Sequence, residues 1–410
     1  MEHLNEIIVQ IQKQVAARID LSRELPDDAL RELIDEVLRE RSRDIYLSVL
    51  ERSQVRSGVF NAMRGLDALQ PLVHDPSITE IMINGPEHIF VEQNGRLFRH
   101  PASFGSSEKL ENVIQNIVAR VNRTVNESTP IVDARLEDGS RVNVVLPPIA
   151  LNGPTVTIRK FPESPFTMKD LIRFGSLTED VAELLERMVR AKYNIFISGG
   201  TGSGKTTFLN ALSNFIPADE RVITIEDSAE LQIKGVENLV RLETRNANME
   251  GVGAITIRDL IKSSLRMRPE RIVVGEVRGG EALDMLQAMN TGHDGSLSTG
   301  HANSTKDMLS RLETMVLTGA DIPLEAIRQQ IASAVDIIIQ LSRLRDHSRR
   351  TVEISEVAGY QNGEIVLNPL YRFEERGEDE SGRVLGGLVR TKNKMLHTQK
   401  FLSAGESDAV

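Results

Sequence analysis

Residues 194–210 read NIFISGGTGSGKTTFLN, and this stretch decides the fold that we expect for the chain. The apolar run Ile195–Ile197 is typical of a buried parallel strand, and apolar residues then recur at helical spacing until Pro217 ends the pattern. Between them, Gly199 to Thr206 match the pattern G-x-x-x-x-G-K-T. Glycines suit such a loop because its backbone turns successive N–H groups inward around phosphate oxygens, beside a helix N-terminus. The stretch therefore predicts a strand, a phosphate loop and a helix.

The loop pattern also predicts a role for each of its residues. Lys205 would reach the β- and γ-phosphates of a nucleoside triphosphate, and the Thr206 hydroxyl would ligate Mg²⁺. An ordinary glycine-rich turn can match the same pattern, but the strand before it and the helix after it favour nucleotide binding. The residues that we expect to bind the nucleotide are Gly200, Thr201, Gly202, Ser203, Gly204, Lys205, Thr206 and Thr207.

The composition limits the classes of protein to which the chain can belong. A length of 410 residues predicts two domains plus extensions, and the absence of cysteine excludes disulfides and thiolate metal sites. The first residues are acidic and polar, and no apolar run approaches the ~18 residues of a membrane span, so we expect no signal peptide, no transmembrane segment and a soluble, cytoplasmic protein. A net charge of -10 and the absence of tryptophan argue against stable binding of nucleic acid.

The first 160 residues predict two different regions. Residues 1–62 are charged and carry apolar residues at helical spacing, which favours a packed helical N-terminal extension over a partner-binding appendage. Residues 63–160 predict a smaller α+β domain, with short strands separated by the turn pairs Asn94–Gly95 and Asp138–Gly139. The following residues, 161–170, form the predicted linker, with a candidate hinge at 161–165.

Residues 171–373 alternate strands with helices, which predicts an α/β domain with a parallel sheet. A hairpin is expected at Val352–Val366, across Asn362–Gly363. Residues 374–410 are charged and glycine-rich, and we expect a poorly ordered tail there. The expected strands of the parallel sheet are Ile195–Ile197, Val222–Ile225, Ile272–Val274, Ser296–Thr299 and Ile337–Leu341.

Acidic residues follow two of these strands at the sheet edge where open parallel sheets bind their ligands. Glu226, directly after Val222–Ile225, is expected to hold Mg²⁺ through water, although a solvated loop can also carry such an acid. Glu276, which follows the strand that ends at Val274, could orient or deprotonate an attacking water. The structural alternative for Glu276 is a salt bridge with Arg278 or Arg268.

Two histidines, His293 and His301, bracket the predicted strand Ser296–Thr299. Their spacing provides no shared face and no third ligand for zinc, even with Asp294 nearby. A lone histidine is more often a core or surface residue. A pair beside a phosphate-loop strand can instead sense the γ-phosphate and link hydrolysis to movement.

Together these motifs resemble the secretion ATPase superfamily of type II secretion, type IV secretion and type IV pili. Its members carry a Walker A loop, an acidic box (here 225–230), a Walker B motif of the form G-E-x-R (here 275–278) and a histidine box (here 292–301). Further segments are similar to the CpaF-type ATPases of Flp/Tad pilus assembly: 139–148, 157–161, 241–245 and 250–259. The resemblance covers the chain from about residue 60 onward.

The resemblance implies a homohexamer, with ATP and Mg²⁺ at the junction of an N-terminal, PAS-like α+β domain and a RecA-like P-loop ATPase domain. Lys205 and Thr206 then form the Walker A pair, and Glu226 and Glu276 are the acids of the acidic box and Walker B motif. His293 and His301 belong to the histidine box. Arg141 and Arg159 match arginines of the N-terminal domain that approach the phosphates.

The expected function is that of a hexameric ATP hydrolase. It would drive assembly, or assembly and retraction, of a Flp/Tad-type pilus through platform proteins at the inner membrane. One alternative is a type IV secretion ATPase that exports protein or DNA. Alternatives from other classes are a RecA-like motor that translocates nucleic acid, since a fold does not fix a function, and a nucleotide switch without turnover.

Overall fold

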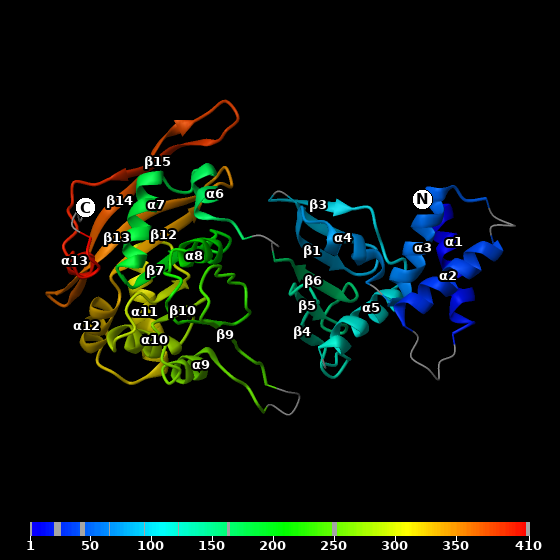
Figure 1. The fold of residues 1–410 in the computed structure, drawn as a ribbon, viewed down its shortest axis with the longest axis horizontal. Coiled ribbons are helices and arrows are strands. Elements are labelled where there is room, and N and C mark those ends of the chain that lie inside the picture. The colour runs from blue at the N-terminus through cyan, green and yellow to red at the C-terminus, as the bar shows by residue number, and fades with distance from the viewer. Residues whose placement is uncertain are drawn as a thin grey trace. The chain divides into compact units, whose positions relative to one another are not determined.

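The computed structural model describes residues 2–19, 26–41, 46–64, 66–93, 95–121, 123–161, 165–247 and 252–406, and the chain divides into two compact units, Met1–Glu163 and Ser164–Val410 (Figure 1). Several features predicted from the sequence fall partly outside these residues. They are Asn94 of a predicted turn, residues 162–164 of the predicted hinge, the start of the motif at 250–259, and the last four residues of the predicted tail.

The first unit begins with three helices that have a core of their own. Helix α2 contributes Leu30, Ile34, Val37 and Leu38 to this core, following the helical spacing seen in the sequence. Helices α1 and α3 complete it with residues such as Ile11 and Val59. The helices are α1 (Glu2–Ala16), α2 (Asp27–Arg41) and α3 (Val49–Arg64).

A six-stranded antiparallel sheet, in the order β3-β2-β1-β6-β5-β4, follows in the same unit. Alternate strand residues, such as Ile81 and Ile83, are buried, and helix α5 packs its apolar stripe into the same core. Strands β2 and β3 lie before and after the predicted turn pair Asn94–Gly95, and β4 and β5 lie before and after Asp138–Gly139; all residues of β3 are at least partly exposed. The elements are η1 (Asp67–Leu69), α4 (Gln70–His74), β1 (Ile78–Asn84), β2 (Ile89–Gln93), β3 (Arg96–His100), α5 (Ser107–Arg120), β4 (Ile131–Arg135), β5 (Arg141–Val145) and β6 (Thr155–Arg159).

The second unit is built on a nine-stranded sheet in the order β15-β14-β13-β12-β7-β11-β10-β8-β9. Strands β12 to β9 in this order are mutually parallel, which confirms the predicted α/β class with a parallel sheet. All five predicted strands are present, and only β9 of the parallel part was not predicted. The parallel strands are β7 (Ile195–Gly199), β8 (Val222–Glu226), β9 (Leu239–Glu243), β10 (Arg271–Val274), β11 (Leu297–Gly300) and β12 (Ile337–Arg343).

Helices cover both faces of this sheet (Figure 1). Ile195 and Ile197 of β7 pack into the core with α6, α7, α8 and α13, whereas Phe196 packs into the core with α9 to α12. Burial on both faces explains why these strands are continuous apolar runs in the sequence. The helices are α6 (Met168–Arg173), α7 (Glu179–Arg190), α8 (Lys205–Ser213), α9 (Ile257–Ser264), α10 (Glu281–Asn290), α11 (Thr305–Gly319), α12 (Leu324–Ala334) and α13 (Gln399–Ser403).

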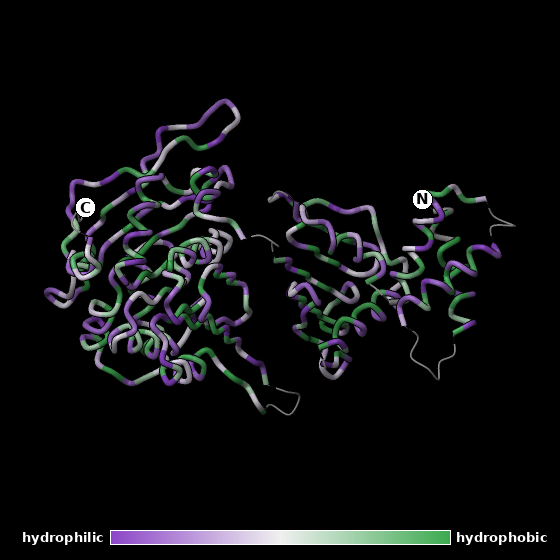
Figure 2. The backbone as a smooth tube through the Cα atoms, viewed as in Figure 1, coloured by the Kyte–Doolittle hydropathy of each residue, from purple (hydrophilic) through white to green (hydrophobic). Residues whose placement is uncertain are grey.

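The sheet continues well beyond the predicted end of the domain at residue 373, so the expectation of a poorly ordered tail is wrong for residues 374–406. Strands β13 (Arg349–Gln361), β14 (Glu364–Glu378) and β15 (Val384–Arg390) add an antiparallel extension. The distal part of β14 is hydrophilic and exposed (Figure 2), which is why the sequence resembles a disordered segment. Backbone pairing with β15 and the ion pairs of Arg345, in the turn between β12 and β13, with Glu375 and Glu378 order it despite this composition.

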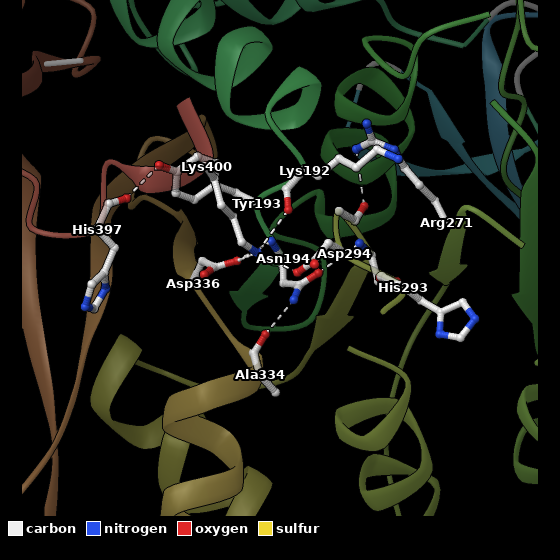
Figure 3. A network of polar contacts seen from close by, with 12 residues as sticks. Lys192, Tyr193, Asn194, Arg271, His293, Asp294, Ala334, Asp336, His397 and Lys400 are labelled. Atoms are coloured by element: carbon white, nitrogen blue, oxygen red, sulfur yellow. Dashed lines mark hydrogen bonds and ion pairs between the residues drawn. The ribbon is translucent and has the colours of Figure 1, made fainter. Parts of the chain in front are cut away.

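The last described residues fold back on the edge of the sheet where the parallel strands begin (Figure 3). Lys400 Nζ donates to Asp336 Oδ2 over 2.7 Å and to Asp294 Oδ1 over 2.8 Å. Phe401 is fully buried beside the ring of Tyr193. These contacts anchor the C-terminal segment on the core. None of the helices in the described ranges has both the length and the apolar character required to cross a membrane.

Candidate functional site

The phosphate loop joins β7 to α8, and three of its glycines are required by its geometry. Gly202 and Gly204 have φ values of +70° and +93°, a region that residues with a β-carbon rarely adopt. A β-carbon on Gly199 would lie 2.5 Å from Ser203 Oγ and 2.7 Å from the Leu341 carbonyl oxygen. The backbone of the loop is thus shaped as the sequence pattern predicts for a phosphate cradle at a helix N-terminus.

The other predicted nucleotide-binding residues line the same turn. Ser203 is buried and donates its hydroxyl hydrogen to the Gly200 carbonyl oxygen over 2.8 Å, which closes the loop. Thr206 and Thr207 are half-buried in the first turn of α8, and Thr201 is exposed at the loop tip. Thr206 directly follows Lys205 in this turn, which is the position expected for a ligand of a nucleotide-bound cation.

Lys205 is largely buried, and its ammonium group is held at the loop. Its Nζ donates to the Gly200 carbonyl oxygen over 3.0 Å and lies 3.2 Å from His301 Nδ1. Burial lowers the pKa of Lys205. Burial, together with the neighbouring Lys205 charge, also lowers the pKa of His301. Because a lysine ammonium can only donate, His301 Nδ1 must accept, and the imidazole proton is then on Nε2.

On the other side of the ring, His301 Nε2 lies 3.0 Å from Glu276 Oε1, which is ion-pair distance; this oxygen has no hydrogen-bond partner among the described residues. The other carboxylate oxygen, Oε2, accepts from Arg278 Nη2 over 2.9 Å, so the salt bridge considered as the structural alternative is present. Lys205, His301 and Glu276 nevertheless form one continuous row that starts at the phosphate loop. Glu276 thus forms the salt bridge with Arg278 and also lies at the candidate site.

Glu226 ends β8 next to this row and is only 3% exposed. Its Oε2 accepts from the backbone N–H groups of Glu230 and Leu231 over 2.8 and 2.9 Å. Its Oε1 is buried and has no hydrogen-bond partner within the described part of the chain. Burial raises the pKa of Glu226 to about 7. A buried acceptor without a partner, at the same edge of the sheet as the phosphate loop, fits a water of a nucleotide-bound Mg²⁺.

The structure does not bring His293 to the phosphate loop. His293 precedes the four-residue strand β11, whereas His301 follows it. A strand of this length spans about 13 Å, so the two histidines lie at opposite edges of the sheet. His293 Nδ1 is 3.3 Å from the Ala288 carbonyl oxygen, in the region of Asp294 and Asn194 (Figure 3). The expectation that both histidines meet the nucleotide is therefore wrong for His293 in this unit.

Arg141 and Arg159, in the first unit, lie directly opposite each other in the register of β5 and β6. Arg135, which the sequence reasoning missed, lies opposite Arg141 in β4. Three arginines thus form a row across neighbouring strands, and Glu80 lies opposite Arg159.

Two further residues that were not predicted from the sequence lie at the phosphate loop itself. Arg349 Nε donates to the Gly202 carbonyl oxygen over 3.0 Å, and Arg343 lies in the same hairpin. No motif marks these two arginines. Only the pairing of β12 with β7, which is a tertiary contact, places them at the loop.

Three comparisons relate this architecture to known proteins. A family model described as "Type II/IV secretion system protein" matches residues 62–381. A putative conjugal transfer protein of Mycobacterium tuberculosis is 32% identical over 336 residues, which cover 80% of this chain and 94% of that protein. The type IV secretion system protein VirB11 of Brucella suis is 34% identical over 303 residues, covering 67% of this chain and 84% of that protein.

A solved structure extends the likeness to the fold. The ATPase DotB of Legionella pneumophila superposes with a TM-score of 0.51 at 22% identity, over 70% of this chain and 79% of that protein. The family model spans more than half of the chain, and it includes the phosphate loop, Glu226, Glu276 and His301. The chain therefore belongs to the family of type II/IV secretion system proteins.

Proposed function

We propose that this chain hydrolyses ATP to drive a secretion or pilus-assembly machine. The observation that carries the proposal is the row of Lys205, His301 and Glu276, which starts at a glycine loop of the phosphate-binding type. The row places a cation, a neutral imidazole and a carboxylate beside the N-terminus of α8. Such a set can bind a triphosphate and act on a water next to its last phosphate.

The reaction is the attack of water on the γ-phosphorus of ATP bound with Mg²⁺. A bond forms between the water oxygen and phosphorus, the bond from phosphorus to the bridging oxygen breaks, and ADP leaves. Glu276 accepts the water proton, because each carboxylate oxygen retains a lone pair beyond its contacts with His301 and Arg278. Lys205 neutralises the phosphate charge, and Thr206 and Glu226 would hold the cation, Glu226 through water.

Steady-state release of phosphate tests this proposal. Lys205→Ala is expected to abolish both binding and turnover, and Glu276→Gln to retain ATP binding while lowering kcat by about 10²-fold or more. Lys234→Ala is a matched control, because Lys234 is an exposed lysine in the same unit. Normal phosphate release by Glu276→Gln would eliminate Glu276 as the base. The absence of any release by the native chain would leave a nucleotide switch.

The finer assignment is a hexameric motor of Flp/Tad pilus assembly that works on platform proteins from the cytoplasmic side of the inner membrane. It is supported by the resemblance of the segments at 139–148 and 241–245 to CpaF-type ATPases. The roles of Arg141 and Arg159 at the phosphates, in the same subunit or a neighbouring one, come from this resemblance as well. Loss of surface pili on removal of the chain from its cell is the expected result.

The second candidate is a type IV secretion ATPase that exports protein or DNA. It is favoured by the names of two relatives, a putative conjugal transfer protein and a type IV secretion system protein. Pili that persist when the chain is removed, together with loss of protein export or DNA transfer, would favour this candidate. ATPase activity that DNA stimulates, with an affinity that falls steeply with salt, would instead indicate a nucleic-acid motor.

A further inference from the structure

Two arginines from the hairpin of β12 and β13 lie against the phosphate loop. Arg349 Nε donates to the Gly202 carbonyl oxygen over 3.0 Å, and a β-carbon on Gly204 would lie 3.2 Å from Arg349 Cδ. A β-carbon on Gly202 would lie 4.0 Å from Arg343 Nη1. Both side chains therefore reach the two glycines whose left-handed backbone shapes the loop.

The placement of these arginines is unfavourable in the protein alone. Arg343 and Arg349 are directly opposite each other in the antiparallel register of β12 and β13, and like charges at such positions repel. Both are exposed. Within the described ranges, neither has a carboxylate at ion-pair distance, so no described acid offsets the repulsion.

The other two arginines of the same hairpin have structural partners. Arg345 pairs with Glu375 of β14 over 2.6 Å, and Arg350 donates to the Phe174 carbonyl oxygen over 3.3 Å. Asp346, at the turn, accepts from the Val384 backbone N–H over 2.9 Å. The contacts with β14 and β15 fix one side of the hairpin, and the contact with Phe174, at the end of α6, fixes it further, so the hairpin holds Arg343 and Arg349 at the loop before any ligand arrives.

The strand order separates these arginines from the row of Lys205, His301 and Glu276. Strand β7 has β11 on one side and β12 on the other. His301 follows β11 and Glu276 follows β10, on the first side, whereas Arg343 and Arg349 belong to β12 and β13, on the second. An anion on the loop therefore meets Glu276 on one side and two guanidinium groups on the other.

We propose that Arg343 and Arg349 bind the diphosphate group of the nucleotide, an inference that rests on the proposed function above. Guanidinium groups bind phosphate oxygens through paired, charge-assisted hydrogen bonds. An anion between the two arginines turns their mutual repulsion into a shared attraction. Because they lie across the loop from Glu276, they contribute to holding ADP and ATP, and the chemical step depends on them much less.

The experiment compares Arg343→Ala, Arg349→Ala and the double variant with the native chain. Isothermal calorimetry with ADP and Mg²⁺ is expected to give a Kd about tenfold higher for each single variant. Competition by inorganic pyrophosphate, which has phosphates but no base, should weaken by the same factor. Arg390→Ala is the matched control, because Arg390 is an exposed arginine of β15, and its Kd should equal that of the native chain.

Thermal unfolding distinguishes ligand binding from a structural role. Without nucleotide, Arg343→Ala should unfold at the same temperature as the native chain or higher, because it removes a repulsion. The increase in Tm on adding ADP should be smaller. A lower Tm without nucleotide combined with an unchanged Kd would assign the arginines to folding and overturn the inference.

Other results overturn it in recognisable ways. An unchanged Kd for ADP in the double variant refutes phosphate binding. A higher Kd for ADP with unchanged pyrophosphate competition would mean that the arginines contact the base or ribose of the nucleotide, which refutes the diphosphate assignment. If the native chain and Lys205→Ala both fail to bind ADP, the proposed function fails instead, so the two failures are distinguishable.

Discussion

Replacing Glu226 by glutamine is expected to stabilise the nucleotide-free protein above neutral pH and to have little effect in acid. Glu226 is 3% exposed, and the backbone N–H groups of Glu230 and Leu231 are the only hydrogen-bond donors to its carboxylate among the described residues. Burial therefore raises its pKa to about 7. Glutamine has nearly the same shape, can accept the same two hydrogen bonds, and carries no charge at any pH.

The direction of the effect follows from proton binding. A glutamate whose pKa rises from 4.5 to about 7 on folding binds its proton more tightly in the folded chain. The folded protein therefore loses stability as the pH rises from about 4.5 to about 7, and the loss is complete above pH 7. The two pKa values correspond to about 3 kcal/mol, so Glu226→Gln should raise the free energy of unfolding by up to about 3 kcal/mol at pH 8.

Urea unfolding at pH 4.5 and pH 8 measures this difference. The chain has no tryptophan and four tyrosines, three of which lie in the second unit, so tyrosine fluorescence reports mainly on the unit that contains Glu226. Glu237→Gln is the matched control, because Glu237 is exposed on the segment between β8 and β9. A gain at pH 8 that persists at pH 4.5, or a loss at pH 8, would refute the reasoning from burial.

Two further predictions concern the second unit. If Glu226 faces a hydrated Mg²⁺, binding of ATP with Mg²⁺ at pH 7 should release up to about half a proton from Glu226. Calorimetry in two buffers of different ionisation enthalpy measures the number of protons released. Glu226→Gln should abolish this release. Lys400→Met removes the cation that Asp336 and Asp294 share, and burial already raises the pKa of Asp336. The variant should lower the free energy of unfolding of the unit by about 1–3 kcal/mol in urea unfolding, since Lys400 and Asp336 are both partly exposed. The double variant with Asp336→Asn should recover this stability. No effect of Lys400→Met would mean that the C-terminal segment does not hold the core.

The sequence predicts the parallel sheet because strands that are buried on both faces are continuous runs of apolar residues. Ile195–Ile197 and Ile272–Val274 are runs of apolar residues too short for helices, and the structure has both as strands between two helical layers. The polar residues that follow such strands gather at one edge of the sheet. Glu226, Glu276 and His301 are found there because strand direction alone determines which end of a strand they follow.

What the sequence could not predict depends on partners distant in the chain. Strands β14 and β15 look disordered because their charges are paired only after the hairpin has formed, as with Arg345 and Glu375. His293 and His301 share one sequence motif, yet a strand between them puts them at opposite sheet edges. Arg343 and Arg349 have no motif, and the pairing of β12 with β7 alone brings them to the phosphate loop.

The groups around this loop have one property in common, because each is unfavourable in the protein without a ligand. Lys205 is a buried cation, Glu226 a buried acid with an oxygen that lacks a partner in the described chain, and Arg343 and Arg349 are like charges side by side. An anion that carries a divalent cation compensates all of them at once: its negative charge pairs with the lysine and arginines, and its cation favours the ionised carboxylate. Unfavourable charges of this kind are expected where a protein is organised to bind a ligand, and in this unit they lie at the edge of the sheet that carries Gly199–Thr206.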